Sequence, residues 1–388
     1  MNVEINIDRL NYLLSLYRMK DTDLLDVLNK DRKRKITGRQ VFAESIDLSI
    51  LKKIDELFGK GLPFYVDPTP LKPSPGMSVF FRKKTFSEEL NFTAKKVVND
   101  YETLKNYLAS LDTLAGVVSK VKIPHCTQRT HPRVAAERVR ALIYPKKHFN
   151  EKDDKGFLRA LIGNLAEAGV LVFEYLESPQ KKEKANIDGF FLRPNFIVLK
   201  RYSYYKREIF TLLHELGHCV LDKEEVESLN VTSLDYNSMS SVERWCNDFA
   251  YYFLVGNEAE KLDAVLKADG TNDYQFPLIE DISKRCFISK RALFTRLFYN
   301  GKMTQADYNN VVHDLNLRSD QFRERQKALM QRTDEEGRRV AIAAPQPIYS
   351  PKFLRTLSVA LNDGTVRPGD LYRMNIPARV VESLPKWL

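Results

Sequence analysis

The sequence predicts an α+β fold, in which a mixed core carries small helical domains at both ends. Two stretches have apolar residues at helical spacing, 209–220 and 240–254, and we expect a strand at 170–176 and a strand pair at 189–199. A length of 388 residues provides for two or three domains with a sizeable core. We therefore expect helices and a small sheet to pack together, with further helices before and after them.

Residues 1–66 are expected to form the first helical module. Helical patterns recur at 10–17, 22–28 and 49–58, and this order resembles the Cro/repressor helix-turn-helix domains. The basic run Lys30–Lys35 occupies the middle, and no recognition helix can be placed there. We therefore favour a packing or partner-binding module over a domain that reads DNA.

Residues 67–85 are expected to form a linker, because Pro68, Pro70, Pro73 and Pro75 stiffen an extended chain. A helical connector follows over 86–128. Within it, residues 88–114 carry apolar side chains at helical spacing and predict one long amphipathic helix. An aromatic-rich stripe of this kind is typical of a core or of a helix–helix contact.

The expected core, residues 129–260, contains Phe-Thr-Leu-Leu-His-Glu-Leu-Gly-His at 210–218. His214 and His218 are four residues apart and share one face of a helix, so both can bind one metal ion. Glu215 between them lies close enough to act on a water molecule at that metal. The alternative is a helix with two surface histidines, and a catalytic zinc site requires a third protein ligand.

Glu243 is the candidate third ligand. It lies in the second predicted helix, whose apolar stripe contains Trp245 and Phe249, and it falls on the other side together with Asn247. A carboxylate on a helix packed across the first completes a zinc site. The pair Ser240 and Glu243 fits a capping box equally well, in which the glutamate only binds the N–H of the cap residue. Spacing alone leaves both roles open.

These two segments resemble the ImmA/IrrE metallopeptidases, whose pattern runs F-T-x-x-H-E-x-x-H and, after a gap, E-x-x-A-N-x-F-A. The resemblance covers residues 130–260 well and implies a gluzincin-like zinc peptidase core. The resemblance implies that the zinc ligands are His214, His218 and Glu243. It implies that the catalytic carboxylate is that of Glu215. With zinc bound, water is acidified toward a pKa of about 7, and Glu215 takes its proton and passes it to the leaving amine. The residue that stabilises the oxyanion stays open among four nearby tyrosines: Tyr202, Tyr204, Tyr205 and Tyr236.

Three positions depart from the family pattern. Cys246 replaces an alanine, Val255-Gly256 replaces Met-Pro, and Asp222 stands where a histidine is common. None of these changes removes a ligand. Asp222 has two readings: an acceptor for the second N–H of His218, or a solvated acid at a helix end, which we favour.

The C-terminal third is expected to be helical at both of its ends. Residues 261–318 resemble the short helix-turn-helix that follows the catalytic part in this family, with 288–293 in its second helix. Residues 319–352 are rich in charge and then in proline, so we expect a linker. Residues 353–388 are expected to form a helical tail whose purpose the sequence does not indicate.

The amino-acid composition limits the possible binding partners and the cellular compartment. The formal net charge of +10 permits contact with nucleic acid, but charge runs are most often solvated faces, so DNA is the minor expectation. Four widely spaced cysteines indicate a reducing compartment. Residues 1–6 lack the features of a secretory leader and no run approaches 18 apolar residues, so we expect a soluble cytoplasmic protein without a membrane partner.

The expected function is site-specific, zinc-dependent cleavage of a protein substrate. The resemblance implies that the substrate is a helix-turn-helix repressor whose removal switches on mobile-element, defence or stress-response genes. The alternatives are a DNA-binding regulator with a structural zinc site and a scaffold protein with a retired peptidase fold. The substrate, the scissile bond, any activating signal and the oligomeric state are not given by the sequence.

Overall fold

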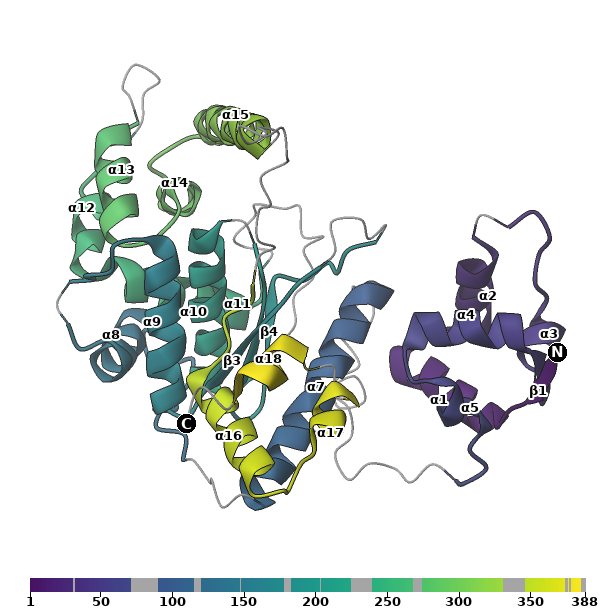
Figure 1. Ribbon diagram of the computed structural model, residues 1–388. Coiled ribbons are helices and arrows are strands. Elements are labelled where there is room, and N and C mark those ends of the chain that lie inside the picture. The colour runs from purple at the N-terminus through teal and green to yellow at the C-terminus, as the bar shows by residue number, and fades with distance from the viewer. Residues whose placement is uncertain are drawn as a thin grey trace, which may run out of the picture. The chain divides into compact units, whose positions relative to one another are not determined.

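The computed structural model of the chain divides into two compact units (Figure 1). It describes residues 1–30, 32–70, 90–114, 120–146, 148–177, 183–202, 204–224, 239–267, 274–330, 346–373, 376 and 378–384. Unit 1 includes Met1–Tyr107 and Gln180–Ile187, and unit 2 includes Leu108–Pro179, Asp188–Val226 and Val231–Leu388. The first boundary lies inside the long helix α7, Phe92–Leu114, and not at either end of the expected 67–85 linker. Most of that linker lies outside the described residues.

The N-terminal part of unit 1 is a helical module closed by a short strand pair. Its elements are β1 (Asn2–Glu4), α1 (Ile7–Tyr17), α2 (Asp21–Asn29), α3 (Gly38–Val41), β2 (Ser45–Asp47), α4 (Leu48–Phe58) and α5 (Leu62–Val66). β1 and β2 pair antiparallel, with Val3 opposite Ile46. The three helices expected at 10–17, 22–28 and 49–58 are all present, and Leu10, Ile54 and Phe58 form part of a buried core.

Helix α7 begins four residues after the position predicted from the sequence and packs onto this module within unit 1. The ring of Phe92 lies 5.4 Å from that of Tyr17 and 5.8 Å from that of Phe58. Lys96 Nζ donates to the backbone oxygen of Leu57, 3.1 Å away, at the C-terminus of α4. The first half of the expected 86–128 connector is therefore part of the N-terminal unit.

Unit 2 is built on a three-stranded sheet in the order β3-β5-β4. β3 (Leu171–Tyr175) runs parallel to β5 (Phe196–Lys200), and β4 (Gly189–Leu192) runs antiparallel to β5 with Phe190 opposite Val198. Four helices share the core on one face of the sheet: α8 (Pro132–Ile143), α9 (Asp154–Glu167), α10 (Tyr205–Leu221) and α11 (Ser241–Val255). Val172, Phe191 and Ile197 point into this core because alternate strand residues face the same side.

The opposite face of the sheet is covered by the C-terminal segment, which is helical over the described part of 353–388. Phe173 stacks on Phe196 there, and Phe353 of α16 (Pro351–Asn362) contacts Phe173 edge-on at 4.9 Å between ring centroids. Thr356 Oγ1 donates to Asp112 Oδ1 at 3.0 Å. The short helices α17 (Pro368–Arg373) and α18 (Ala378–Ser383) follow. α16 is therefore one layer of the fold.

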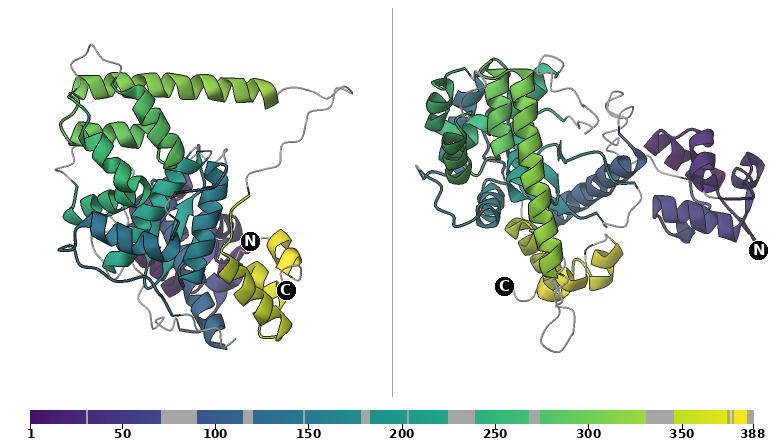
Figure 2. Two further views of the ribbon diagram at one scale, coloured as in Figure 1. Left: turned by 90° about the vertical axis from the view of Figure 1, so that its left-hand side faces the viewer. Right: turned by 90° about the horizontal axis from the view of Figure 1, so that it is seen from above.

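The segment after α11 is helical throughout its described part. It contains η2 (Gly256–Glu258), α12 (Ala259–Asp263), α13 (Phe276–Arg285), α14 (Lys290–Tyr299) and α15 (Gln305–Met330). Four residues join α13 to α14, and the Arg296 guanidinium of α14 forms an ion pair with Asp248 of α11, so α14 packs on the core. Figure 2 shows α15 as one long helix, and this corrects the expected linker over 319–352 up to Met330. Its Arg, Glu, Gln and Lys residues are strong helix formers, so their charge suits an exposed helix as well as a linker.

The described chain has four free cysteines, of which Cys219, Cys246 and Cys286 are buried and Cys126 is half-buried. Burial raises the pKa of the Cys219 thiol to about 12 and that of Cys286 to about 11. Both thiols are therefore protonated at neutral pH. Among the described helices, none has the length and apolar composition needed to cross a membrane.

Candidate metal centre

Helix α10 carries the motif and is fixed by its apolar side. Leu212, Leu213 and Leu216 are fully buried in the core of unit 2. α11 crosses α10 closely at Gly217, where an added Cβ would lie 3.1 Å from Cys246 Cα and 3.2 Å from Cys246 Sγ. Small residues on both helices therefore let the backbones approach. This close crossing brings the first turn of α11 beside the two motif histidines.

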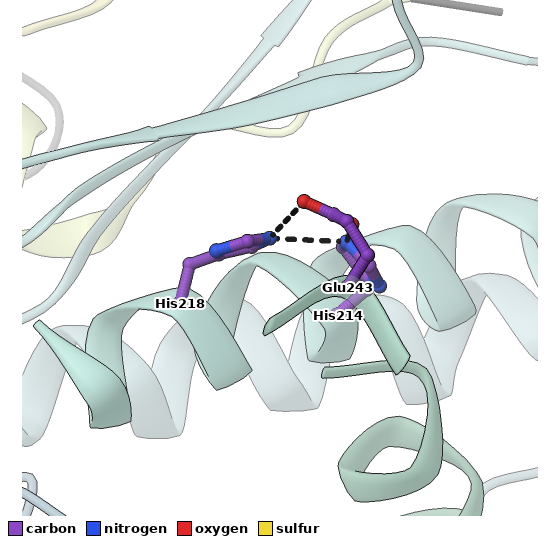
Figure 3. Close-up of side chains that lie close together, drawn as sticks. All are labelled: His214, His218 and Glu243. Carbon is purple, nitrogen blue, oxygen red and sulfur yellow. Dashed lines mark hydrogen bonds and ion pairs between the residues drawn. The ribbon is translucent and has the colours of Figure 1, made fainter. Parts of the chain in front are cut away.

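Three predicted ligand atoms meet at this crossing (Figure 3). His214 Nε2 lies 3.0 Å from Glu243 Oε2, and His218 Nε2 lies 3.2 Å from Glu243 Oε1 and 3.2 Å from His214 Nε2. Two atoms bound to one zinc ion at about 2.0–2.1 Å with tetrahedral angles lie about 3.3 Å apart. The donor types and the separations therefore both fit a single zinc ion.

Glu243 directs its carboxylate to the histidines. Its backbone N–H donates to Ser240 Oγ at 3.1 Å, which is one half of the capping arrangement considered from the sequence. The carboxylate, however, contacts both imidazoles, and the residue is 5% exposed. Burial alone would raise the pKa of Glu243, but the His214 and His218 imidazoles outweigh it and hold that pKa well below its usual range. The carboxylate is therefore in its ionised, ligand-competent form.

Asn247 orients His214, and the sequence-based site did not include it. Asn247 Oδ1 lies 2.9 Å from His214 Nδ1, and its Nδ2 donates to the sulfur of Met239 at 3.7 Å. An amide oxygen only accepts hydrogen bonds, so His214 carries its proton on Nδ1 and keeps the Nε2 lone pair for the cluster. The signal in the sequence is the spacing of one helical turn between Glu243 and Asn247.

Asp222 does not orient His218. It ends α10 in the left-handed conformation, with φ 51°, and its Oδ1 lies 2.9 Å from Arg193 Nε. The structure therefore agrees with the favoured reading of Asp222 as an acid at the helix end. His218 is 1% exposed, and its Nδ1 has no hydrogen-bond partner in the described part of the chain.

Glu215 lies on the same helix as the histidines but outside the three-residue cluster. The residue is 5% exposed, and its side chain passes beside strand β4, where a Cβ added to Gly189 would be 3.3 Å from Glu215 Cγ. Glu215 is therefore not one of the clustered ligand residues, and its side chain lies between α10 and β4.

The tyrosines considered for the oxyanion are engaged elsewhere or lie outside the described residues. The hydroxyl of Tyr202 donates to Asp188, and that of Tyr204 lies 2.9 Å from Ser319 Oγ. The ring of Tyr205 lies under the guanidinium of Arg201, 4.1 Å from ring centroid to Cζ. Tyr236 is outside the described residues. The structure thus brings none of the three described tyrosines into the His–His–Glu cluster.

Comparison with known proteins finds one family model that matches this segment. Residues 167–275, which run from the end of α9 to the start of α13, match the M78 peptidase family model, described as the IrrE N-terminal-like domain. Neither the comparison with curated proteins nor that with solved structures gives a significant match. Residues 167–275 are therefore similar to the ImmA/IrrE family of metallopeptidases.

Proposed function

We propose that this protein is a gluzincin-type, zinc-dependent endopeptidase that cuts a transcriptional repressor or regulator at one site. The observation that carries the proposal is the convergence of His214, His218 and Glu243, with Glu215 on the same helix. The family match supports peptidase chemistry. The resemblance to peptidases that cut regulators of mobile-element, defence or stress-response genes supports the choice of substrate.

Each residue at the site has one task in this proposal. His214 and His218 bind zinc through Nε2, Glu243 binds it through its carboxylate, and Asn247 holds the His214 ring in place. Zinc there supplies a Lewis acid that acidifies water and polarises the scissile carbonyl. Glu215 accepts a proton from the attacking water and donates it to the leaving amine, so the products leave without net consumption of protons by the protein.

Strand β4 is the proposed docking edge for the substrate. It pairs with β5 on one side, and among the described residues it has no strand on the other. An extended substrate segment adds to such an edge through main-chain hydrogen bonds, and this selects segments that are extended or locally unfolded. Because Gly189 of β4 lies beside Glu215, a segment on this edge passes the catalytic carboxylate.

The experiment that tests the function uses the helix-turn-helix repressor encoded beside this gene as the substrate. We expect about one zinc per protomer by elemental analysis and one cleavage site in the repressor by mass spectrometry. Glu215→Gln is expected to keep zinc and fold but to lose cleavage, because glutamine cannot accept the proton. Absence of a bound transition metal, both after purification without chelator and after titration, would sink the metallopeptidase assignment.

Casein provides the specificity control. A regulatory peptidase obtains its selectivity from docking as well as from the cleft, so we expect slow cutting or none of unfolded casein. Cutting of casein at many sites with the neighbouring repressor left whole would reject the regulatory role and leave the zinc chemistry standing.

DNA binding by unit 1 is the second candidate, and one loop favours it. Lys30, Lys33, Arg34 and Lys35 are exposed between α2 and α3. The base of this loop is closed by Asn29, whose side chain accepts from Ile36 N at 2.6 Å and donates to Ile36 O at 2.9 Å. If this loop contacts phosphates, charge reversal at Lys33 and Arg34 lowers DNA affinity and its salt dependence. An unchanged salt dependence would reject this candidate.

A further inference from the structure

Strand β4 meets the catalytic helix at a point where only a glycine fits. A Cβ built on Gly189 would lie 2.7 Å from Thr211 Cγ2, 3.0 Å from the backbone oxygen of Val198 and 3.3 Å from Glu215 Cγ. Real Cβ atoms essentially never approach another heavy atom to within 3.0 Å. Thr211 and Glu215 are one helical turn apart, so β4 packs along the face of α10 that carries the proposed proton acceptor.

Backbone conformation does not explain this glycine. Gly189 is not among the residues with positive φ, and its backbone belongs to a regular antiparallel pair opposite Leu199. Gly189 is the first residue of β4, a strand position that residues with a side chain adopt readily. The space between β4 and α10 is therefore the reason for a glycine at this position.

The residue before it fixes the strand at this distance. Asp188 accepts hydrogen bonds from Arg207 Nε and Nη2 of α10, at 2.9 and 2.5 Å, and from the hydroxyl of Tyr202. Its backbone oxygen accepts from Lys200 N at 2.7 Å. Because Asp188 is held both by α10 and by the end of β5, β4 has little freedom to move away from the helix. A side chain at position 189 must instead displace the groups on α10.

We propose that Gly189 is a positioning residue that sets the location of the Glu215 carboxylate at the metal centre. The proposal rests on the function proposed above. An alanine at 189 would have to lengthen the contact with Thr211 from 2.7 Å to the ordinary 3.4 Å or more, and the Glu215 stem lies in the same path. Displacements approaching 1 Å at a catalytic group cost about 100-fold in rate. The three heavy atoms nearest to the added Cβ belong to none of the metal ligands, so we expect metal binding to be kept.

The test compares Gly189→Ala with Gly163→Ala, a matched change in α9 where an added Cβ has no neighbour within 4 Å. The probe is acetohydroxamic acid, which chelates zinc through its two oxygens and passes its hydroxyl proton to a nearby carboxylate. Its dissociation constant is measured by calorimetry on the zinc-loaded full chain, and zinc affinity is measured separately by chelator competition. We expect Gly189→Ala to raise the dissociation constant of the hydroxamate at least fivefold and to keep zinc affinity within twofold of the parent. Glu215→Gln is expected to raise the same dissociation constant. Gly163→Ala is expected to leave both values unchanged.

A compensating variant covers the case in which Gly189→Ala folds poorly. Thr211→Ser removes the methyl group at 2.7 Å, so the double variant Gly189→Ala/Thr211→Ser is expected to recover part of the hydroxamate affinity relative to Gly189→Ala, or to fold where the single variant does not. The proposal is overturned if Gly189→Ala binds hydroxamate like the parent. It is also overturned if both Gly189 variants lose zinc and hydroxamate together, which would indicate a general structural role. Failure of the proposed function itself has a separate signature: no zinc bound by the parent, or no hydroxamate effect from Glu215→Gln.

Discussion

Glu174→Gln should stabilise unit 2 at alkaline pH and remove part of its pH dependence. Glu174 lies in β3, is 4% exposed and shares its surroundings with the fully buried Glu208. Burial, followed by the charge of Glu208, raises the pKa of Glu174 to about 8. Arg201 Nη1 binds the two oxygens of Glu208 at 2.9 and 3.0 Å, and Arg201 Nε lies 3.9 Å from Glu174 Oε2, so one guanidinium faces two carboxyl groups. Glutamine at 174 reproduces the neutral form and still accepts from Ile348 N, which lies 2.6 Å from Glu174 Oε2.

The direction of this pH dependence follows from how many protons the folded and the unfolded chain bind. An unfolded glutamate has a pKa of about 4.3, whereas the pKa of Glu174 in the folded chain is about 8, so between these values only the folded state keeps the proton. The contribution of Glu174 to the free energy of unfolding is complete below the unfolded pKa. It falls as pH rises between the two pKa values and is constant above the folded pKa. One pH unit corresponds to about 1.4 kcal/mol, which gives a ceiling of about 5 kcal/mol across the window. Relaxation and water penetration around buried charges reduce such ceilings, so we expect a difference of about 2 kcal/mol.

Urea unfolding of the parent and of Glu174→Gln at pH 5 to 9 measures this difference. Tryptophan fluorescence reports on unit 2, because Trp245 lies in α11 of that unit. The free energies of unfolding should lie close together at pH 5 and separate toward pH 8, with the variant the more stable. Parallel pH profiles for the two proteins would refute a buried, proton-bearing Glu174.

Three further predictions concern the metal centre and the far face of the sheet. Glu243→Gln should weaken zinc binding at least tenfold, because it removes the carboxylate charge 3.0 Å from His214 Nε2. A zinc affinity within a few-fold of the parent would reject Glu243 as a ligand. Asn247→Ala should weaken zinc binding by about 10–100-fold, measured by the same chelator competition, and an unchanged affinity would show that its contact with His214 is incidental. Phe353→Ala should destabilise unit 2 by about 3–5 kcal/mol in urea unfolding at pH 7, with the exposed Leu317→Ala as control; a loss below about 1 kcal/mol would mean that α16 packs only loosely.

The metal centre was largely predictable because its chemistry is local. His214, Glu215 and His218 lie within five residues of one helix, so helical geometry alone gives their common face. Glu243 was ambiguous, since a capping box and a ligand have the same spacing, and only the crossing at Gly217 decides where its carboxylate points. Asn247 was missed because its partner is an imidazole on another helix, and sequence spacing does not show contacts between helices.

The missed parts of the fold have different causes. Helix α9 is absent from the sequence-based prediction, although Phe157, Leu161 and Leu165 carry its helical period. Helix α15 was taken as a linker beyond residue 318 because a charged segment has the same composition in an exposed helix. The docking of α16 depends on a contact with Phe173 across 180 positions of sequence, and no local pattern carries that information.

The packing of α16 on the sheet bears on the order in which the protein is made. A ribosome synthesises β3 long before Phe353, and the emerging chain holds the newest residues in the exit tunnel. Until α16 is released, Phe173 and Phe196 remain solvent-exposed, and the Glu174 carboxyl lacks the Ile348 N–H that faces it in the finished fold. The sheet that supports β4 therefore gains the cover on its second face only after α16 has been synthesised.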